Sequence, residues 1–264
     1  MFQYKLRNCP LGNDEIKPYL SHVSAEGHID DKGSLVLTFN ESLPEYKASE
    51  HISLLREYMR SLKQKDTLYQ LIDTEEIDDR FDDYSDKLAL EFRIESFGAF
   101  GSGVHDTTDG CMKLIEEFCK EHQETLTSVR ALDIGTGTGI LSLFSHYRGI
   151  RNITSVDISL RAVISALHNF RLNDIADSIR LKQGSIADID GRFELIIANI
   201  FLSAIEEIFD DICTKTVQGG TIILSGVKAE KEQSLFRLID RYPSLSIKKK
   251  LVKGEWICIY IYKK

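Results

Sequence analysis

A glycine-rich segment between two predicted elements restricts the fold more than any other feature of the sequence. The segment is Asp133-Ile134-Gly135-Thr136-Gly137-Thr138-Gly139, and it lies between an apolar stretch and a predicted helix at Ile140–Tyr147. Glycine lets the backbone turn tightly and lets a ligand approach without a Cβ clash. A strand, a glycine loop and a helix in this order are typical of α/β folds that bind ligands at the carboxyl ends of their strands.

Apolar strands alternate with helices through residues 97–264. The predicted strands are Val129–Ile134, Ile153–Asp157, Phe193–Ala198 and Thr221–Ser225, and Ser159 is expected to cap a helix after the second of them. Continuous apolar strands separated by helices predict a parallel sheet that is covered on both faces. Leu245–Val252 and Trp256–Tyr262 form a predicted C-terminal hairpin, which would add an antiparallel strand to this α/β sheet.

The spacing around the glycine loop indicates which ligand it holds. Asp157 closes the next strand 18 residues after Gly139, where a carboxylate can accept both hydroxyls of a ribose. Ile140 stands where a dinucleotide fingerprint would have Gly or Ala, so no pyrophosphate cradle is expected. The pattern favours S-adenosyl-L-methionine as the cofactor. A nicotinamide dinucleotide and a glycine turn without a ligand are the alternatives.

A second glycine-rich loop precedes the first predicted helix of this region. It covers Gly98–Thr108 and leads into a helix predicted over Asp109–Glu121. The helix N-terminus would offer backbone N–H groups and a positive dipole end to the carboxylate of a bound methionine moiety. The alternative is a capped helix with a flexible lead.

Residues 1–75 predict a small α+β domain that contains no catalytic cluster. A strand at Gly33–Phe39 follows a turn signal, the capping box Ser42–Glu45 begins a helix, and another strand is expected near Leu68–Ile72. Residues 73–95 then contain ten acidic side chains. Such a charge run is usually a solvated linker, although it could also cradle a lysine-rich partner. We therefore divide the chain into residues 1–75, an acidic linker at 76–96 and a third part at 97–264.

Composition narrows the function classes. A formal net charge of −8 over 264 residues argues against coating nucleic acid and would suit a basic protein partner. The five cysteines form no CxxC pair, so we expect reduced thiols and neither a disulfide framework nor a metal site. The first residues lack a secretory apolar core, and the apolar stretches are too short to cross a bilayer. These features predict a cytoplasmic protein.

Three motifs together resemble the ribosomal protein L11 lysine methyltransferase family. They are Ala99–Thr108, which is similar to the family's AFGTGTHPTT loop, Leu132–Leu141, which is similar to its LDxGxGxGIL motif, and Ala198-Asn199-Ile200. The pieces at Leu224–Val227 and Glu255-Trp256 also look like the family. The resemblance covers about residues 94–264.

The resemblance implies a class I S-adenosylmethionine-dependent methyltransferase with an N-terminal, ferredoxin-like domain that recognises a ribosomal protein. It implies that Thr108, Gly135, Asp157 and Asn199 contact the cofactor. Asp133 and Gly137 would shape the loop, and Ser185 and Ile186 would border the adenine. The predicted cofactor site also includes Phe100, His105, Thr107, Gly139 and Ile158.

Asn199 is the candidate catalytic residue. Methyl transfer to nitrogen needs a neutral amine held close to the methyl group, and the Asn199 oxygen could accept a hydrogen bond from that amine and orient its lone pair. The alternative is a turn-forming side chain. One departure from the family pattern is Asp106, which stands where the family has proline and is a favourable N-cap residue.

Three functions remain open at this point. The first is a protein-lysine or α-amine N-methyltransferase that acts on a ribosomal or other basic protein. The second is a small-molecule methyltransferase on the same fold, and the third is a non-catalytic protein that binds S-adenosylmethionine and acts as a regulator. The intact glycine loop, together with Asn199, favours an enzyme.

Overall fold

The structure is a computed structural model of the chain, and it describes residues 2–6, 25–29, 35–39, 92–94, 101 and 105–264. The chain divides into two compact units, Met1–Asp79 and Arg80–Lys264, which are described separately here. Within the described residues, no helix is long and apolar enough to span a membrane.

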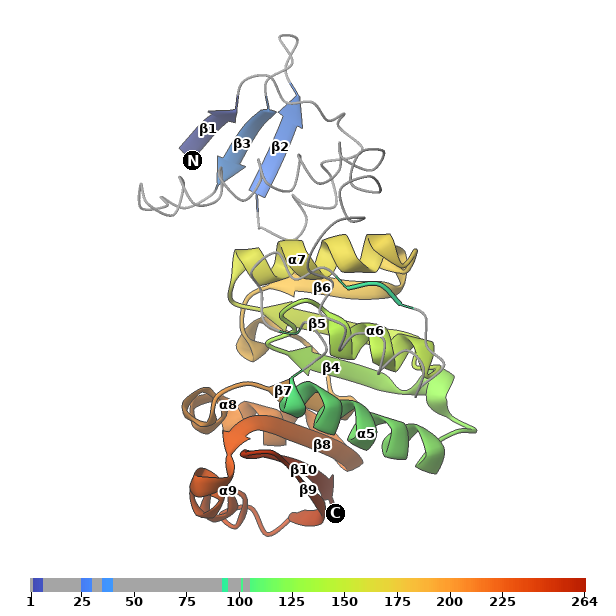
Figure 1. The fold of residues 1–264 in the computed structure, drawn as a ribbon. Coiled ribbons are helices and arrows are strands. Elements are labelled where there is room, and N and C mark those ends of the chain that lie inside the picture. The colour runs from blue at the N-terminus through green and yellow to red at the C-terminus, as the bar shows by residue number, and fades with distance from the viewer. Residues whose placement is uncertain (1, 7–24, 30–34, 40–91, 95–100, 102–104) are drawn as a thin grey trace. The chain divides into compact units, whose positions relative to one another are not determined.

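The first unit contains a three-stranded antiparallel sheet. Its strands are β1 (Phe2–Leu6), β2 (Ala25–Ile29) and β3 (Leu35–Phe39), and β3 lies in the centre between the other two (Figure 1). The predicted strand at Gly33–Phe39 is thus confirmed from Leu35 onward. The helix predicted after Ser42 and the strand predicted near 68–72 lie outside the described residues, as does most of the predicted linker, so the ferredoxin-like arrangement stays a prediction.

The second unit is built on a seven-stranded sheet with the order β6-β5-β4-β7-β8-β10-β9. Its strands are β4 (Arg130–Ile134), β5 (Asn152–Asp157), β6 (Ile179–Gln183), β7 (Phe193–Asn199), β8 (Thr216–Lys228), β9 (Leu245–Lys253) and β10 (Trp256–Lys263). The five strands from β6 to β8 are parallel, and β10 is antiparallel to both of its neighbours. The predicted parallel sheet with a C-terminal antiparallel hairpin is confirmed.

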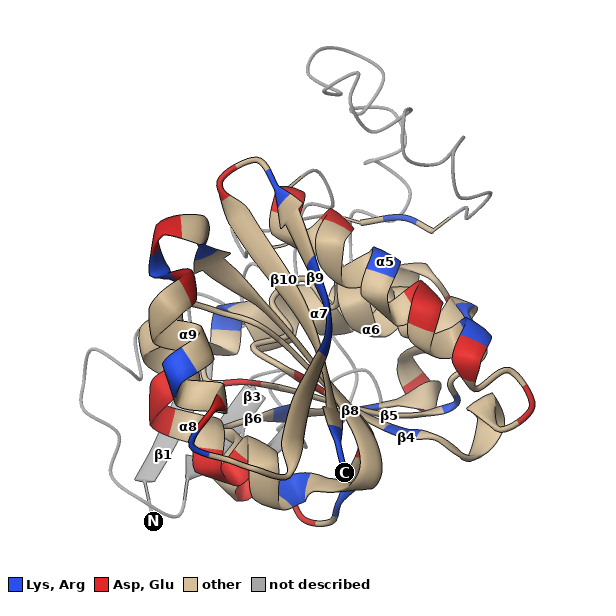
Figure 2. Cartoon of the chain, turned by 90° about the horizontal axis from the view of Figure 1, so that it is seen from below, with Lys and Arg blue, Asp and Glu red and all other residues tan. Residues whose placement is uncertain are grey.

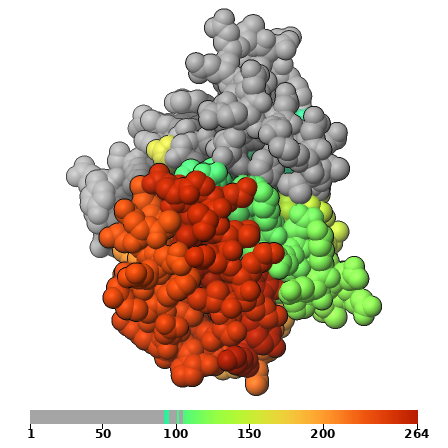
Figure 3. Space-filling model, turned by 60° about the horizontal axis from the view of Figure 1, so that its bottom comes forward, coloured from blue at the N-terminus to red at the C-terminus, as the bar shows by residue number. Residues whose placement is uncertain are grey.

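Helices cover both faces of this sheet (Figure 1). They are α5 (Asp106–Glu121), α6 (Ile140–Tyr147), α7 (Leu160–Leu172), α8 (Leu202–Lys215) and α9 (Glu232–Ile239). Successive strand residues point to opposite faces, so Leu132 and Ile134 pack in the core under α8 and α9, whereas Asp133 faces α6. The residues after 200, orange and red in Figure 3, form one continuous surface beside the green residues of α5.

The helix after the glycine loop, α6, has the bounds that the sequence predicts, and the helix after β5, α7, is capped as predicted. Ser159 caps α7 by accepting a hydrogen bond from the Ala162 amide, and Leu160, Val163 and Leu167 are buried along that helix. Burial of residues 195–198 of β7 between α5 on one face and α8 on the other explains the apolar run at these positions. The parallel strands therefore all end at one edge of the sheet, where the loops meet.

Candidate functional site

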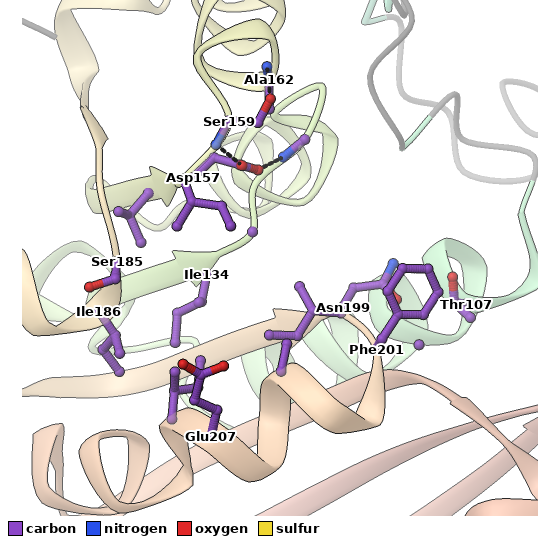
Figure 4. A pocket seen from close by; sticks show the side chains of 18 of the residues that line it. Thr107, Ile134, Asp157, Ser159, Ala162, Ser185, Ile186, Asn199, Phe201 and Glu207 are labelled. Carbon is purple, nitrogen blue, oxygen red and sulfur yellow. Dashed lines mark hydrogen bonds between the residues drawn. The ribbon is translucent and has the colours of Figure 1, made fainter. Parts of the chain in front are cut away.

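A cavity of about 580 Å³ lies at the carboxyl ends of the parallel strands (Figure 4). Its walls come from the glycine loop, the end of β5, the start of α5, the short helix η4 (Ile186–Asp188), and the end of β7 with the first turns of α8. The lining is largely apolar, with a few polar groups from different elements. This combination is typical of a site for a small organic molecule.

The glycine loop bends under the cavity in a conformation that only glycine adopts easily. Gly135 and Gly137 have φ angles of +68° and +57°, and both line the cavity. A Cβ on Gly135 would stand 2.4 Å from the Ile200 Cγ2 atom. The Gly135 amide donates to the Val156 carbonyl oxygen at 2.9 Å, which joins the loop to β5. The loop is therefore held against β5, and its glycines leave the side that faces the cavity open to a ligand.

Asp157, the predicted ribose carboxylate, ends β5 and lines the cavity. Its Oδ2 atom accepts from the Gly137 amide at 3.0 Å, and its Oδ1 atom accepts from the Ser159 amide at 2.9 Å. Burial raises the pKa of this carboxyl, and the two backbone bonds act in the opposite direction. Each carboxylate oxygen can accept more than one hydrogen bond, so Asp157 can hold the loop and still accept from a ligand.

Asp133 lies beneath the glycine loop and does not line the cavity. Its Oδ2 atom accepts from the Thr136 and Ser142 hydroxyls, each at 2.7 Å, so the carboxyl ties the loop to the first turn of α6. Burial raises the pKa of Asp133 to about 6, and these two hydrogen bonds oppose the shift. Asp133 therefore supports the site from below.

Helix α5 begins earlier than the sequence predicts. His105 is the N-cap, and its Nδ1 atom accepts from the Thr107 amide at 3.3 Å and lies 2.8 Å from the Thr107 hydroxyl. The prediction of a start at Asp109 was wrong, and Asp106 is the first helical residue rather than the cap. The His105 side chain can replace Ser or Asp in this role because its ring nitrogen reaches the same amide. This bond also occupies one N–H group that we expected to be free for a ligand.

Among the residues that the structure describes, two buried oxygen atoms near the carboxyl edge have no hydrogen-bond partner. They are the Asn199 Oδ1 atom at the end of β7 and the Thr108 Oγ1 atom in the first turn of α5. Buried polar atoms are nearly always paired, so each exception needs an explanation. Asn199 lines the cavity, whereas Thr108 is fully buried behind it. The Asn199 oxygen is therefore available to a donor that enters the cavity.

Helix α8 contributes lining residues that the sequence analysis missed. Phe201, Ala204, Glu207 and Ile208 all face the cavity, at spacings that place them on one side of the helix. Phe201 is 74% exposed at the rim, and Ile158 at the end of β5 is 77% exposed. Both side chains therefore offer apolar surface to a molecule that enters the cavity. Helical spacing that begins directly after Asn199 was the available signal.

The structure brings most of the predicted cofactor residues to one cavity. Those that line it are His105, Thr107, Gly135, Gly137, Asp157, Ile158, Ser185, Ile186 and Asn199. Thr108, Asp133 and Gly139 lie outside the lining, and a Cβ on Gly139 would stand 2.5 Å from the Phe170 ring, so this glycine serves packing. Phe100 lies outside the described residues. Gly101 of the same loop is described, and its carbonyl oxygen accepts a hydrogen bond from the Thr138 hydroxyl at 2.6 Å.

The cysteines take no part in the cavity lining. Cys111, Cys119, Cys213 and Cys258 are buried free thiols, and Cys9 lies outside the described residues. In the part of the chain that the structure describes, no cluster of His, Cys, Asp and Glu side chains could hold a metal ion. The charged side chains that line the cavity are Asp157, Arg161 and Glu207, and Asn199 lies among its polar ones.

The sequence matches a known family over most of its length. A family model described as "Ribosomal protein L11 methyltransferase (PrmA)" matches residues 71–264. The ribosomal protein L11 methyltransferase of Trichlorobacter lovleyi is 35% identical over 162 residues, which are 61% of this chain and 53% of the relative. That of Staphylococcus epidermidis is 36% identical over 162 residues, which are 61% of this chain and 50% of the relative. The chain thus spans about half the length of the curated relatives it matches.

Solved structures share the fold. A crystal structure of a ribosomal protein L11 methylase from Lactobacillus delbrueckii subsp. bulgaricus matches with a TM-score of 0.57 and 30% identity, over 63% of this chain and 81% of that one. The magnesium protoporphyrin IX methyltransferase from Synechocystis, with bound SAM, matches with a TM-score of 0.50 and 13% identity, over 71% of this chain and 92% of that one. At so low an identity, the second match concerns the fold alone.

Proposed function

The chain belongs to the ribosomal protein L11 methyltransferase family, and from this premise we propose that it transfers methyl groups from S-adenosylmethionine to amino groups of a ribosomal protein. Ribosomal protein L11 is the acceptor that the relatives' names suggest. The observation that carries the proposal is the unpaired Asn199 oxygen in a cavity that the glycine loop frames. The acceptor's lysine or α-amino nitrogen is the donor that this oxygen lacks.

The cavity's residues fit the proposed cofactor. Asp157 would accept from the ribose hydroxyls, and Gly135 and Gly137 let the ligand lie close to the backbone. Ser185 and Ile186 would border the adenine at one end. Thr107 at the start of α5 would lie near the methionine carboxylate, where the helix dipole favours negative charge. Most of the lining is apolar, as a flat purine ring requires.

The chain's own groups orient the acceptor. When bound, S-adenosylmethionine supplies a methyl group on a positively charged sulfur. The Asn199 oxygen accepts an N–H bond and so directs the nitrogen lone pair toward the cavity. An amide cannot remove a proton at neutral pH, so the amine must lose its proton to another acceptor before or during binding. Phe201, exposed at the rim, would cover the aliphatic part of the acceptor side chain.

The rest of the chain would bring the acceptor to the cavity. We assign residues 1–75 to substrate recognition and residues 76–96 to an acidic linker, with the methyltransferase domain at 97–264. Ten acidic residues at positions 73–95 complement a basic ribosomal protein in charge. Further acidic residues lie on α8, red in Figure 2, and one of them, Glu207, lines the cavity. An acidic surface would speed encounter with a basic acceptor.

The test is methyl transfer to ribosomal proteins. The purified chain is incubated with methyl-tritiated S-adenosylmethionine and unmethylated proteins of the large ribosomal subunit, and labelled proteins are separated by mass. We expect one small basic protein to be labelled, with the label lost in Asn199→Ala. Asn152→Ala is the matched control, because Asn152 is exposed at the opposite end of β5 and should leave the label unchanged.

Other outcomes would replace the proposal. A label that extracts into organic solvent, with no labelled protein, would indicate a small-molecule methyltransferase. Cofactor binding in calorimetry without any labelled product would indicate a binding protein without catalysis. Equal labelling by wild type and Asn199→Ala would show that the reaction does not require the Asn199 side chain.

A further inference from the structure

One side of the cavity, here called the slot, has apolar side chains from η4 and α8 in its lining. Helix α8 packs against η4, and Ile186 of η4 and Ile208 of α8 both line the cavity. Ile134 and Val156, at the ends of β4 and β5, line it as well. In Figure 4, Ile134 and Ile186 lie toward this side, whereas Thr107, Asn199 and Phe201 lie toward the other. The slot therefore suits a flat ring, away from the site of methyl transfer.

The polar side chains of η4 are already used within that helix. The Ser185 hydroxyl accepts from the Ala187 amide at 3.2 Å and donates to the Asp188 Oδ2 atom at 3.1 Å. The same carboxylate oxygen accepts from the Ser185 amide at 2.7 Å, which completes a capping box. These bonds lower the pKa of Asp188. On this side, a ligand in the slot therefore meets a capped helix whose Asp188 carboxylate is already bound to the helix's own backbone.

Glu207 on α8 is the carboxylate of this slot that has no such partner. It lines the cavity, and it makes no hydrogen bond or ion pair with any described residue. Figure 4 shows its carboxylate beside Ile134, on the opposite side of the cavity from Asp157. Glu207 and its neighbour Glu206 are both exposed, but Glu206 does not line the cavity. Glu207 is thus a carboxylate acceptor at the cavity wall that can accept from a donor on the ligand.

We propose that Glu207 accepts a hydrogen bond from the 6-amino group of the adenine ring and selects adenine over other purines. This inference rests on the proposed function, because it takes the ribose to lie at Asp157 and the adenine in the slot. The 6-amino group is the donor on the adenine edge, and a carboxylate is a pure acceptor. A 6-oxo purine would present an oxygen to the same carboxylate and be repelled.

The experiment compares two ligands in three proteins by calorimetry. The ligands are S-adenosylhomocysteine and its analogue with unsubstituted purine in place of adenine, which lacks only the 6-amino group. The proteins are wild type, Glu207→Ala and Glu206→Ala. Glu206→Ala removes the same charge one residue away, so it controls for the general electrostatic attraction of the surface.

We expect wild type to bind S-adenosylhomocysteine about tenfold more tightly than the purine analogue, as for a hydrogen bond to a charged group. Glu207→Ala should bind S-adenosylhomocysteine about tenfold more weakly than wild type does. Its affinity for the analogue should be nearly unchanged, so the preference between the two ligands should disappear. Glu206→Ala should keep the wild-type preference. A thermal unfolding curve for each variant shows that it is folded.

Two results would overturn the inference while the proposed function stands. One is a wild-type protein that binds both ligands equally well. The other is a Glu207→Ala variant that keeps the tenfold preference for S-adenosylhomocysteine. A wild-type protein that binds neither ligand would instead contradict the proposed function itself.

Discussion

The Asp157 carboxylate accepts a hydrogen bond from the Gly137 amide at 3.0 Å, and this bond joins the end of β5 to the glycine loop after β4. The second carboxylate oxygen accepts from the Ser159 amide at the start of α7. A single side chain thus fixes the loop on one side and a helix start on the other. Its remaining lone pairs are directed by these two bonds, so any ligand contact to Asp157 depends on the same geometry.

Removal of the Asp157 carboxylate should therefore weaken cofactor binding strongly. We expect Asp157→Ala to raise the Kd for S-adenosylhomocysteine roughly a hundredfold, because two charge-assisted hydrogen bonds to the ribose are lost. Asp157→Asn keeps one acceptor oxygen and should raise the Kd about tenfold. Calorimetry measures both values, and Asp177→Ala, at an exposed aspartate, is the control. A Kd for Asp157→Ala within twofold of wild type would contradict the assignment of the ribose site.

The position of Gly135 should tolerate no side chain. Gly135→Ala would meet the Ile200 Cγ2 atom at 2.4 Å and adopt a φ of +68°, so we expect displacement of the loop and at least tenfold weaker binding of S-adenosylhomocysteine. Gly191→Ala is the matched control, since its φ is +97° but nothing lies within 4 Å of its Cβ. Both variants carry backbone strain and only one carries the clash. Equal binding losses in the two would show that strain alone is responsible.

The parts of the site that the sequence predicted belong to short, local patterns. Gly135, Gly137 and Asp157 lie within one strand–loop–helix–strand unit, where the order of elements brings them to one edge of the sheet. Phe201 and Glu207 were missed because helical spacing after Asn199 indicates a helix but not which of its faces meets the cavity, which depends on how α8 packs against η4. That contact joins segments that no periodicity in the sequence relates.

The ends of the helices and strands were likewise predicted less well than their presence, because they depend on contacts between distant segments. We predicted a strand at Thr221–Ser225, whereas β8 covers Thr216–Lys228. Pairing with β7 extends the strand back to Thr216, through Gly219 and Gly220, and pairing with β10 extends it forward to Lys228. The His105 cap was missed for a related reason, since histidine is uncommon as an N-cap and only the folded loop places its ring near the Thr107 amide.

Close packing of α5 on β10 should make Gly110 intolerant of substitution. A Cβ at this position would stand 2.1 Å from the Cys258 Sγ atom, which lies 3.0 Å from the Ser225 hydroxyl oxygen. We expect Gly110→Ala to lower the free energy of unfolding by about 1–3 kcal/mol through overpacking. Urea unfolding followed by the fluorescence of Trp256, the single tryptophan in the chain, measures the change.

A second substitution tests the cause of that loss. Cys258→Ala removes the sulfur atom, so the double variant should be more stable than the sum of the two single effects predicts. Strict additivity of the two losses would show that the Gly110 methyl group does not meet Cys258.

The buried carboxyl of Asp133 should make stability depend on pH. Its pKa rises from near 3.8 to about 6 on folding, mainly through burial, so the native state binds more protons than the unfolded state between these values. Stability from this group is therefore present at pH 4 and is lost as the pH rises to 6, by up to about 3 kcal/mol. Asp133→Asn lacks this titration. Relative to wild type, the variant should gain stability between pH 4 and 6, and the difference should be constant above about pH 7.

Urea unfolding at intervals from pH 4 to pH 8, followed through Trp256, measures the two curves. The change in their separation is the informative quantity, because the lost hydrogen bonds from Thr136 and Ser142 add only a constant offset. Ser142→Ala gives an independent check, since its hydroxyl lowers the pKa of Asp133. Without that hydroxyl, the loss of stability should extend to higher pH than in wild type. Parallel curves for wild type and Asp133→Asn would mean that Asp133 titrates alike in the folded and unfolded chain.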